Sequence, residues 1–304
     1  MRKVKQIKEK EGKDSLFKEI KFKSQAAMEY LMTYGWAILI IALALGVLYS
    51  LGIMNPKNFL PRAPPGSCFV FRPNGPGTTD FVSLQGTCGY LPMYVGSFNG
   101  VNSYVRVENF PSSPSVTIML WVLFENSADV PVSKISDSNA SGTQTFNFYY
   151  DPNQVLRATI WTADGTGHEI SMGVQPMRKW LFVAETFDGS TYTHSAYLNG
   201  ALINSRSYTL GIRQVIAPLN IGRWWAGDPK WHTGLIANVQ IYNTALTPQE
   251  IQYLYQQGLG GGPVRLQNLV AWWPLNGDAK DYSGNNNHGT IYGGVTFVQN
   301  YNPP

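Results

Sequence analysis

Residues 180–200 read WLFVAETFDGSTYTHSAYLNG, and this stretch decides the fold. It holds two runs rich in aromatic and β-branched residues, separated by a turn at Asp188 and Gly189. Similar runs occur on both sides at spacings of roughly 10–15 residues, with Gly, Asn, Pro or Asp between them. The pattern predicts an antiparallel β-sandwich. The other runs are MYVGSFNG, SYVRVENF, SVTIMLWVLF, TFNFYYD, VLRATIWT, PLNIGRW and GLIANVQIYN.

One short helix is expected next to the last of these runs, in LTPQEIQYLYQQG. Thr247 is its predicted N-cap, Pro248 its first residue and Glu250 the second half of a capping box, and Gly258 ends it. A longer helix is expected near the N-terminus. The predicted fold class is therefore α+β overall, with a long N-terminal α-helix followed by an all-β antiparallel sandwich.

The sandwich segments resemble the laminin-G-like, concanavalin A-like jelly roll. Phe98-Asn99-Gly100 followed by Tyr104-Val105 is similar to one strand of that family, and residues 180–200 are similar to one of its hairpins. Residues 234–250 are similar to its last strand and helix. The resemblance implies the fold but no particular ligand, because this fold carries lectins, adhesion modules and glycanases.

The order of the segments departs from that family. LVAWWPLNG at 269–277 and DYSGNNNHGT at 281–290 resemble the family's first strand and the loop after it, yet they stand at the end of the chain. We expect a circular permutation, in which residues 264–304 fold back and supply the missing first strands. The alternative is that they begin a second, truncated domain.

Residues 26–53 form an apolar run in which Glu29 is the only charged residue. As a helix the run would be about 42 Å long, which exceeds the ~30 Å hydrocarbon core of a bilayer. Residues 1–24 hold nine Lys or Arg and four acids, so the excess positive charge lies before this run. The remainder of the chain has no basic surface that would predict nucleic-acid binding.

The sequence Lys23-Ser24-Gln25-Ala26-Ala27-Met28-Glu29 resembles the class III signal peptide of archaeal type IV pilins. The resemblance implies cleavage by a prepilin peptidase between Ser24 and Gln25. Glu29 would then be the fifth residue and could neutralise the new N-terminus of a neighbouring pilin subunit, which fixes register. The helix would lie in the membrane before assembly. The alternative is a plain membrane anchor.

The expected organisation is a cleaved cytoplasmic leader at 1–24, a transmembrane or filament-core helix at 25–55, a Pro-rich linker at 56–67, a disulfide loop at 68–92 and the sandwich at 93–304. Cys68 and Cys88 are the two cysteines, and an extracellular setting favours a disulfide between them. Asn139 stands in the sequon Asn-Ala-Ser and is the expected glycosylation site.

Two candidate sites lie in the sandwich. The family resemblance implies a calcium ion, the candidate cofactor, at Asp281 with the carbonyl oxygens of Asn285 or His288 nearby. An Ala at 237 stands where that family often has a second acid. Trp224, Trp225 and Trp231 crowd one loop, RWWAGDPKWHTG, which favours contact with a glycan or another surface ligand.

No enzyme is expected, because the clustered acids of glycanases are missing; Glu185 and Asp188 are the nearest approach. The residues favour an adhesive subunit of a type IV pilus-like filament on the cell surface, which displays a lectin-like domain. The alternative is a non-polymerising, membrane-anchored extracellular protein that binds carbohydrates or surfaces.

Overall fold

The computed structural model describes Met32, residues 34–46, the backbone of two short strands, residues 92–137 and 142–299, and Tyr301. The chain divides into two compact units, Met1–Pro61 and Arg62–Pro304, and each is considered by itself. Several predicted features lie outside the described residues, namely the cleavage site at Lys23, Ser24 and Gln25, the assembly residue Glu29, the cysteines Cys68 and Cys88, and the sequon at Asn139.

The first unit contains a helix over residues 34–46. Its side chains are exposed, among them Trp36 at 67 %, Ile38 at 67 % and Ile40 at 62 %. The expected long helix over 25–55 is thus described only in its middle part. Among the described residues, no helix combines the length and the apolar character that a bilayer crossing requires.

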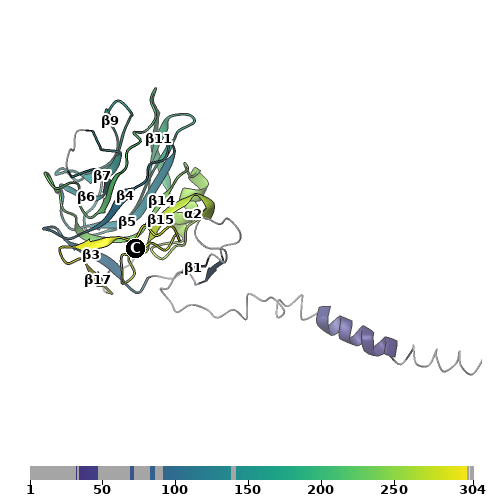
Figure 1. Ribbon diagram of the computed structural model, residues 1–304. Helices are drawn as coiled ribbons and strands as arrows, with labels where there is room; N and C mark the ends of the chain where they lie inside the picture. The colour runs from purple at the N-terminus through teal and green to yellow at the C-terminus, as the bar shows by residue number, and fades with distance from the viewer. Residues whose placement is uncertain are drawn as a thin grey trace, which may run out of the picture. The chain divides into compact units, whose positions relative to one another are not determined.

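The second unit is an antiparallel β-sandwich, as predicted (Figure 1). One layer, the major sheet, has the strand order β12-β11-β10-β5-β14-β3-β17, and β15 also pairs with β14. Its strands are β3 (Val95–Asn99), β5 (Val116–Phe124), β10 (Trp180–Asp188), β11 (Thr193–Leu198), β12 (Ala201–Ser207), β14 (Thr233–Tyr242), β15 (Leu269–Trp273) and β17 (Thr296–Val298).

The other layer, the minor sheet, has the strand order β16-β4-β13-β6-β7-β8-β9. Its strands are β4 (Tyr104–Phe110), β6 (Asp129–Lys134), β7 (Phe146–Tyr150), β8 (Val155–Trp161), β9 (Gly167–Val174), β13 (Ala217–Ile221) and β16 (Thr290–Tyr292). A separate pair, β1 (Phe69–Phe71) and β2 (Ser83–Gln85), precedes the sandwich.

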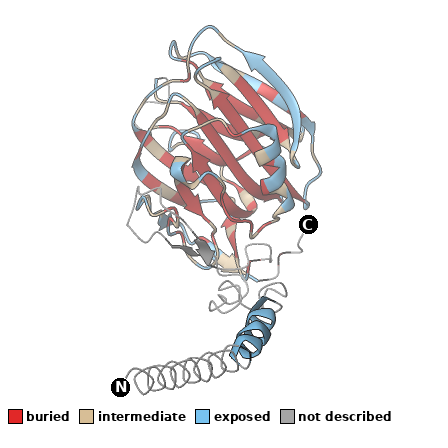
Figure 2. Ribbon diagram, turned by 90° about the vertical axis from the view of Figure 1, so that its right-hand side faces the viewer, coloured by how far each residue is buried: buried red, intermediate tan, exposed pale blue. Residues whose placement is uncertain are grey.

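The main core fills the space between the two sheets, and a second core covers the outer face of the major sheet. Buried residues accordingly run along most of the strands (Figure 2). Successive side chains of a strand point to opposite faces, so β5 contributes to both cores. Leu120 and Val122 lie between the sheets, whereas Met119 and Trp121 lie under the helix α2 (Pro248–Gln256). Trp121 stacks on Tyr255 of α2 at 5.6 Å between ring centroids.

The predicted helix boundaries of α2 are confirmed. Thr247 is its N-cap, and Glu250 accepts a hydrogen bond of 2.8 Å from the Thr247 N–H. The Thr247 hydroxyl accepts one of 3.3 Å from the Glu250 N–H, which completes the capping box. Gly258 follows the C-cap with a φ of 72°, a left-handed conformation that glycine adopts without strain. Ile251 and Leu254 then fix the helix on the major sheet.

The last strands of the chain join both sheets. β15 pairs with β14, β17 pairs with β3, and β16 extends the minor sheet beside β4. Trp273 is buried between the sheets and contacts Phe110, while Trp272 is buried in the outer core. The Trp180 indole donates to the backbone oxygen of Tyr301 at 3.0 Å. That this strand order arose by circular permutation stays a prediction.

Deletion of residues 264–304 should therefore unfold the sandwich. The deletion removes β15, β16 and β17, and the loss of Trp273 alone creates a cavity that typically costs about 3–5 kcal/mol. That is a large share of the stability of an ordinary domain, about 5–15 kcal/mol. Urea denaturation followed by circular dichroism measures the effect. Cooperative unfolding of the truncated chain at unchanged midpoint would contradict the shared core.

Candidate functional site

The outer face of the minor sheet carries the polar and aromatic side chains that its inner face excludes. Along β4, Val105 and Val107 point into the core, so Tyr104, Arg106 and Glu108 point outward. The side chains of β7 and β8 alternate in the same way, so a second set of side chains points away from the core. This set comprises Asn147, Tyr149, Arg157, Thr159 and Trp161.

Residues 223–231, the 223–231 loop, are held on this face at both ends. At its start, the Ser133 hydroxyl donates to the carbonyl oxygens of Arg223 and Trp224, at 2.9 and 3.1 Å. The side-chain amide of Asn220 donates to the same Trp224 oxygen at 3.0 Å. Just past its end, His232 pairs with Asp129 at 2.8 Å, with both side chains buried. The loop is thereby fixed by strands of the sandwich.

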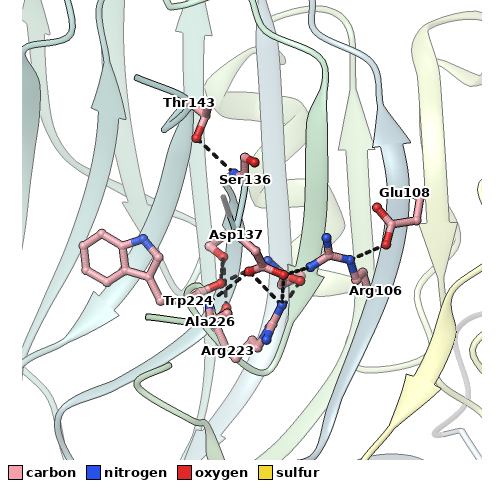
Figure 3. A network of polar contacts seen from close by, with 10 residues as sticks. Arg106, Glu108, Ser136, Asp137, Thr143, Arg223, Trp224 and Ala226 are labelled. Carbon is pink, nitrogen blue, oxygen red and sulfur yellow. Dashed lines mark hydrogen bonds and ion pairs between the residues drawn. The ribbon is translucent and has the colours of Figure 1, made fainter. Parts of the chain in front are cut away.

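Asp137 ties the loop to β4 (Figure 3). Its carboxylate accepts two hydrogen bonds from Arg223 Nη2, at 2.9 and 2.8 Å, and one of 2.9 Å from the Ala226 N–H. Arg106 donates to the same carboxylate and also pairs with Glu108. Partial burial acts to raise the pKa of Asp137, but the Ala226 N–H and the two guanidinium groups outweigh it and hold that pKa below its usual value.

One aromatic group lies at the β4 side of the face. The rings of Tyr104 and Tyr292 stack at 4.7 Å with 8° between their planes, and Trp231 lies 5.6 Å from Tyr104. The Arg223 guanidinium lies 3.9 Å from the centre of the Tyr104 ring. Asp137 therefore positions a cation that in turn packs against this aromatic group.

A second aromatic group surrounds Trp224. Its ring centroid lies 6.4 Å from that of Tyr149 and 6.3 Å from that of Trp161. Lys230 Nζ lies 5.6 Å from the centre of the Trp224 ring. All these rings are partly exposed, so a ligand can reach them.

The three tryptophans of the loop thus have different surroundings. Trp224 and Trp231 belong to the two aromatic groups of the minor sheet. Trp225 folds over its own loop instead: a Cβ added to Gly227 would meet the Trp225 ring at 2.2 Å. The arrangement suits the first two rings to ligand contact and the third to shaping the loop.

The residues predicted for calcium lie in one loop, but they do not fit the ion. Asp281 Oδ1 accepts from the N–H groups of Trp272 and Ser283, at 2.9 and 2.8 Å. Its Oδ2 accepts from the Ser283 hydroxyl at 2.8 Å and from the Asn287 N–H at 2.9 Å. These donors occupy all the lone pairs that a cation would need, whereas calcium takes six to eight oxygen ligands.

The side chains of the other two residues, Asn285 and His288, bind within the same loop and to β15. The Asn285 amide donates to the carbonyl oxygens of Leu269 and Val270, at 2.7 and 2.9 Å, and His288 Nδ1 accepts the Asp281 N–H at 3.1 Å. No cluster of three or more His, Cys, Asp or Glu side chains occurs in the described part of the chain. The Asp281 carboxylate is therefore the centre of a structural hydrogen-bond network of the loop.

The two acids of the central hairpin are not placed for glycoside hydrolysis. Glu185 is fully buried and lies 3.0 Å from His194 Nε2. Burial raises the pKa of Glu185 well above its usual value and lowers the pKa of His194 to about 3. Asp188 instead accepts hydrogen bonds from Ser190 in the turn.

Several residues of the face are absent from the sequence-based prediction. Tyr104, Tyr149 and Trp161 alternate with apolar residues along their strands, a signal that could have marked them as outward-facing. Tyr292 and Asp137 had no such signal, because β16 and the segment after β6 reach the face only through long-range pairing.

The sequence matches the family model of the concanavalin A-like lectin/glucanases superfamily over residues 99–252. No curated protein matches significantly.

Solved structures share the fold. A heptameric pentraxin from Limulus polyphemus aligns with a TM-score of 0.50 and 15 % identity, over 67 % of this chain and 94 % of its own. A candidate carbohydrate-binding protein from Bacteroides ovatus aligns with a TM-score of 0.50 and 17 % identity, over 68 % of this chain and 59 % of its own.

Replacing Asp137 by Asn should loosen the 223–231 loop. The change removes the charge that holds Arg223 and Arg106, and such charged hydrogen bonds contribute about 1.5–3 kcal/mol each. Hydrogen–deuterium exchange at Ala226 should accelerate, whereas Asp228→Asn, at an exposed acid, is the matched control. Equal exchange in both variants would contradict the role of Asp137.

The same contacts predict how the loop responds to acid. Because the pKa of Asp137 is lowered, its stabilising effect is fully present above the ordinary aspartate value of 3.8 and is lost as the pH falls below it. Exchange at Ala226, corrected for the intrinsic rate, should be constant from pH 8 to 5 and should rise only in stronger acid. A transition near pH 6 would point to a different group.

Proposed function

The chain belongs to the concanavalin A-like lectin/glucanases superfamily, and on that premise we propose that its sandwich is a carbohydrate-binding module. The binding surface is the outer face of the minor sheet together with the 223–231 loop. The observation that carries the proposal is the pair of partly exposed aromatic groups around Trp231 and Trp224, held on a rigid sheet.

The chemistry of the face suits sugars. A pyranose ring has an apolar face of C–H groups that packs on an aromatic ring, while its hydroxyls require hydrogen-bond partners. Here aromatic rings alternate with polar side chains of β4, β7 and β8. The candidate carbohydrate-binding protein from Bacteroides ovatus has the same fold, which is in keeping with this proposal.

The charges on the face favour a neutral glycan. Asp137 pairs with Arg106 and Arg223, Asp228 pairs with Lys230, and the acid Asp151 pairs with Arg157. The cations are thus already matched by acids of the chain and offer little net attraction to an acidic sugar.

A panel of neutral and acidic oligosaccharides tests this function. A neutral sugar should bind, and Trp224→Ala and Trp231→Ala should each weaken binding about 10-fold or more, as central aromatic contacts do. Tyr253→Ala, at a 51 % exposed ring on α2, is the matched control and should bind normally.

Two results would overturn the proposal. One is the absence of binding to any member of the panel by the folded protein. The other is binding that both tryptophan variants retain in full.

We further propose that the N-terminal helix holds the module at the cell surface, as a subunit of a pilus-like filament. The support is the pilin-like sequence at 23–29 and the exposed apolar side chains of residues 34–46, which need a membrane or neighbouring helices to cover them. A non-polymerising membrane anchor is the simpler alternative, and glycan binding does not depend on the choice.

Mass-spectrometric sequencing of the N-terminus in sheared surface filaments separates the two. A filament subunit should begin at Gln25, because the prepilin peptidase cuts before the apolar run. Detection only in the membrane fraction, with Met1 retained, would contradict the filament.

A further inference from the structure

A cavity of about 470 Å³ lies between the two sheets, away from the outer face of the minor sheet. It sits where β4 ends and β5 begins, and the C-terminal segment forms one of its walls. Phe110, Phe146 and Ile241 supply apolar lining, while the amides of Asn285 and Asn287 lie on the C-terminal wall. Its size is within the range of small-molecule sites.

Lys134 of β6 lines this cavity and is only 1 % exposed. Its Nζ donates to the carbonyl oxygens of Pro111 and Val215, at 2.9 and 2.8 Å, and to the Ser112 hydroxyl. That hydroxyl directs its own hydrogen to the Val215 oxygen, so it is an acceptor toward Lys134. Three acceptors call for three N–H groups, which only the charged ammonium provides.

This buried charge has no counter-ion within the described residues, because none of their carboxylates lies within ion-pair distance of Nζ. Burial is the cause that lowers the pKa of Lys134 to about 7. The other titratable group that lines the cavity is Tyr242, whose hydroxyl donates to Gln240 and whose pKa burial raises. Thr145 also lines the cavity, and its buried hydroxyl oxygen has no hydrogen-bond partner.

We propose that this cavity is a second ligand site, which takes a small organic carboxylate with an apolar body. The carboxylate supplies the counter-ion that Lys134 lacks through charge–charge attraction, while the three ammonium N–H groups stay on their protein acceptors. The apolar body fills the space between Phe110, Phe146 and Ile241. An uncompensated charge in a site of low polarity costs free energy that an opposite charge offsets. The site is independent of the glycan-binding face.

The pH dependence of binding follows from the same lysine. An anion that binds the ammonium form must raise the pKa of Lys134, and by linkage its affinity must fall once the free protein loses that proton. Affinity should thus be nearly constant from pH 5 to 6 and should decline above pH 7.

Phenylacetate and phenylacetamide are suitable probes, because they share one apolar body and differ in charge. Titration of the full chain, followed by calorimetry and by NMR, should show phenylacetate binding about 10-fold or more tightly than phenylacetamide at pH 6. Lys134→Met should abolish that preference. Lys280→Met, which removes a 70 % exposed lysine, should retain it.

The comparison of the two probes on the unaltered chain stands even if Lys134→Met fails to fold. Equal affinities of the acid and the amide, no binding of either probe, or an affinity for phenylacetate that does not decline between pH 7 and 9 would overturn the site. Trp224→Ala and Trp231→Ala should leave phenylacetate binding unchanged, so failure of the glycan proposal is distinguishable from failure of this one.

Discussion

The burial of two adjacent tryptophans on opposite faces of β15 is the constraint on which the rest of the structure depends. Trp273 enters the core between the sheets and donates its indole N–H to the Asn287 oxygen at 2.9 Å, whereas Trp272 enters the outer core and donates to Asn238 at 2.8 Å. The backbone N–H of Trp272 in turn donates to the Asp281 carboxylate at 2.9 Å. One short segment, β15, therefore contributes to both cores and to the wall of the inter-sheet cavity, and it anchors the loop that follows it.

The two proposed sites illustrate two uses of charge in one sandwich. On the outer face, Asp137 is surrounded by donors, so the charges there position the loop and its aromatic rings before any ligand arrives. Such preorganisation reduces the entropic cost of binding. Between the sheets, Lys134 has carbonyl and hydroxyl acceptors without an opposing charge, so the electrostatic balance is left to a ligand.

The sequence predicts the sandwich and the capping box of α2 because both depend on local patterns, namely alternating apolar residues and the Thr247–Glu250 spacing. It could not reveal that Tyr292 stacks on Tyr104, since these residues meet only through the pairing of β16 with β4. The predicted calcium ion does not fit at Asp281, because hydrogen bonds already occupy the lone pairs of this carboxylate. The sequence motif predicts which residues lie near one another, but it does not show which of their lone pairs are occupied. The burial of Glu185 and Lys134 could not be predicted either, because it depends on the tertiary structure and not on a local pattern.

The contact between the beginning and the end of the sandwich has a mechanical consequence. The Tyr301 hydroxyl donates to the carbonyl oxygen of Pro92, next to β3, and β3 lies hydrogen-bonded between β14 and β17. A pull on the chain from its N-terminal side would enter the sandwich at this point and run along β3. Because Val95 at the start of β3 pairs with Val298 at the end of β17, a pull between the two ends of the sandwich would open this pair one hydrogen bond at a time, as a zipper does, beginning at the Tyr301–Pro92 contact.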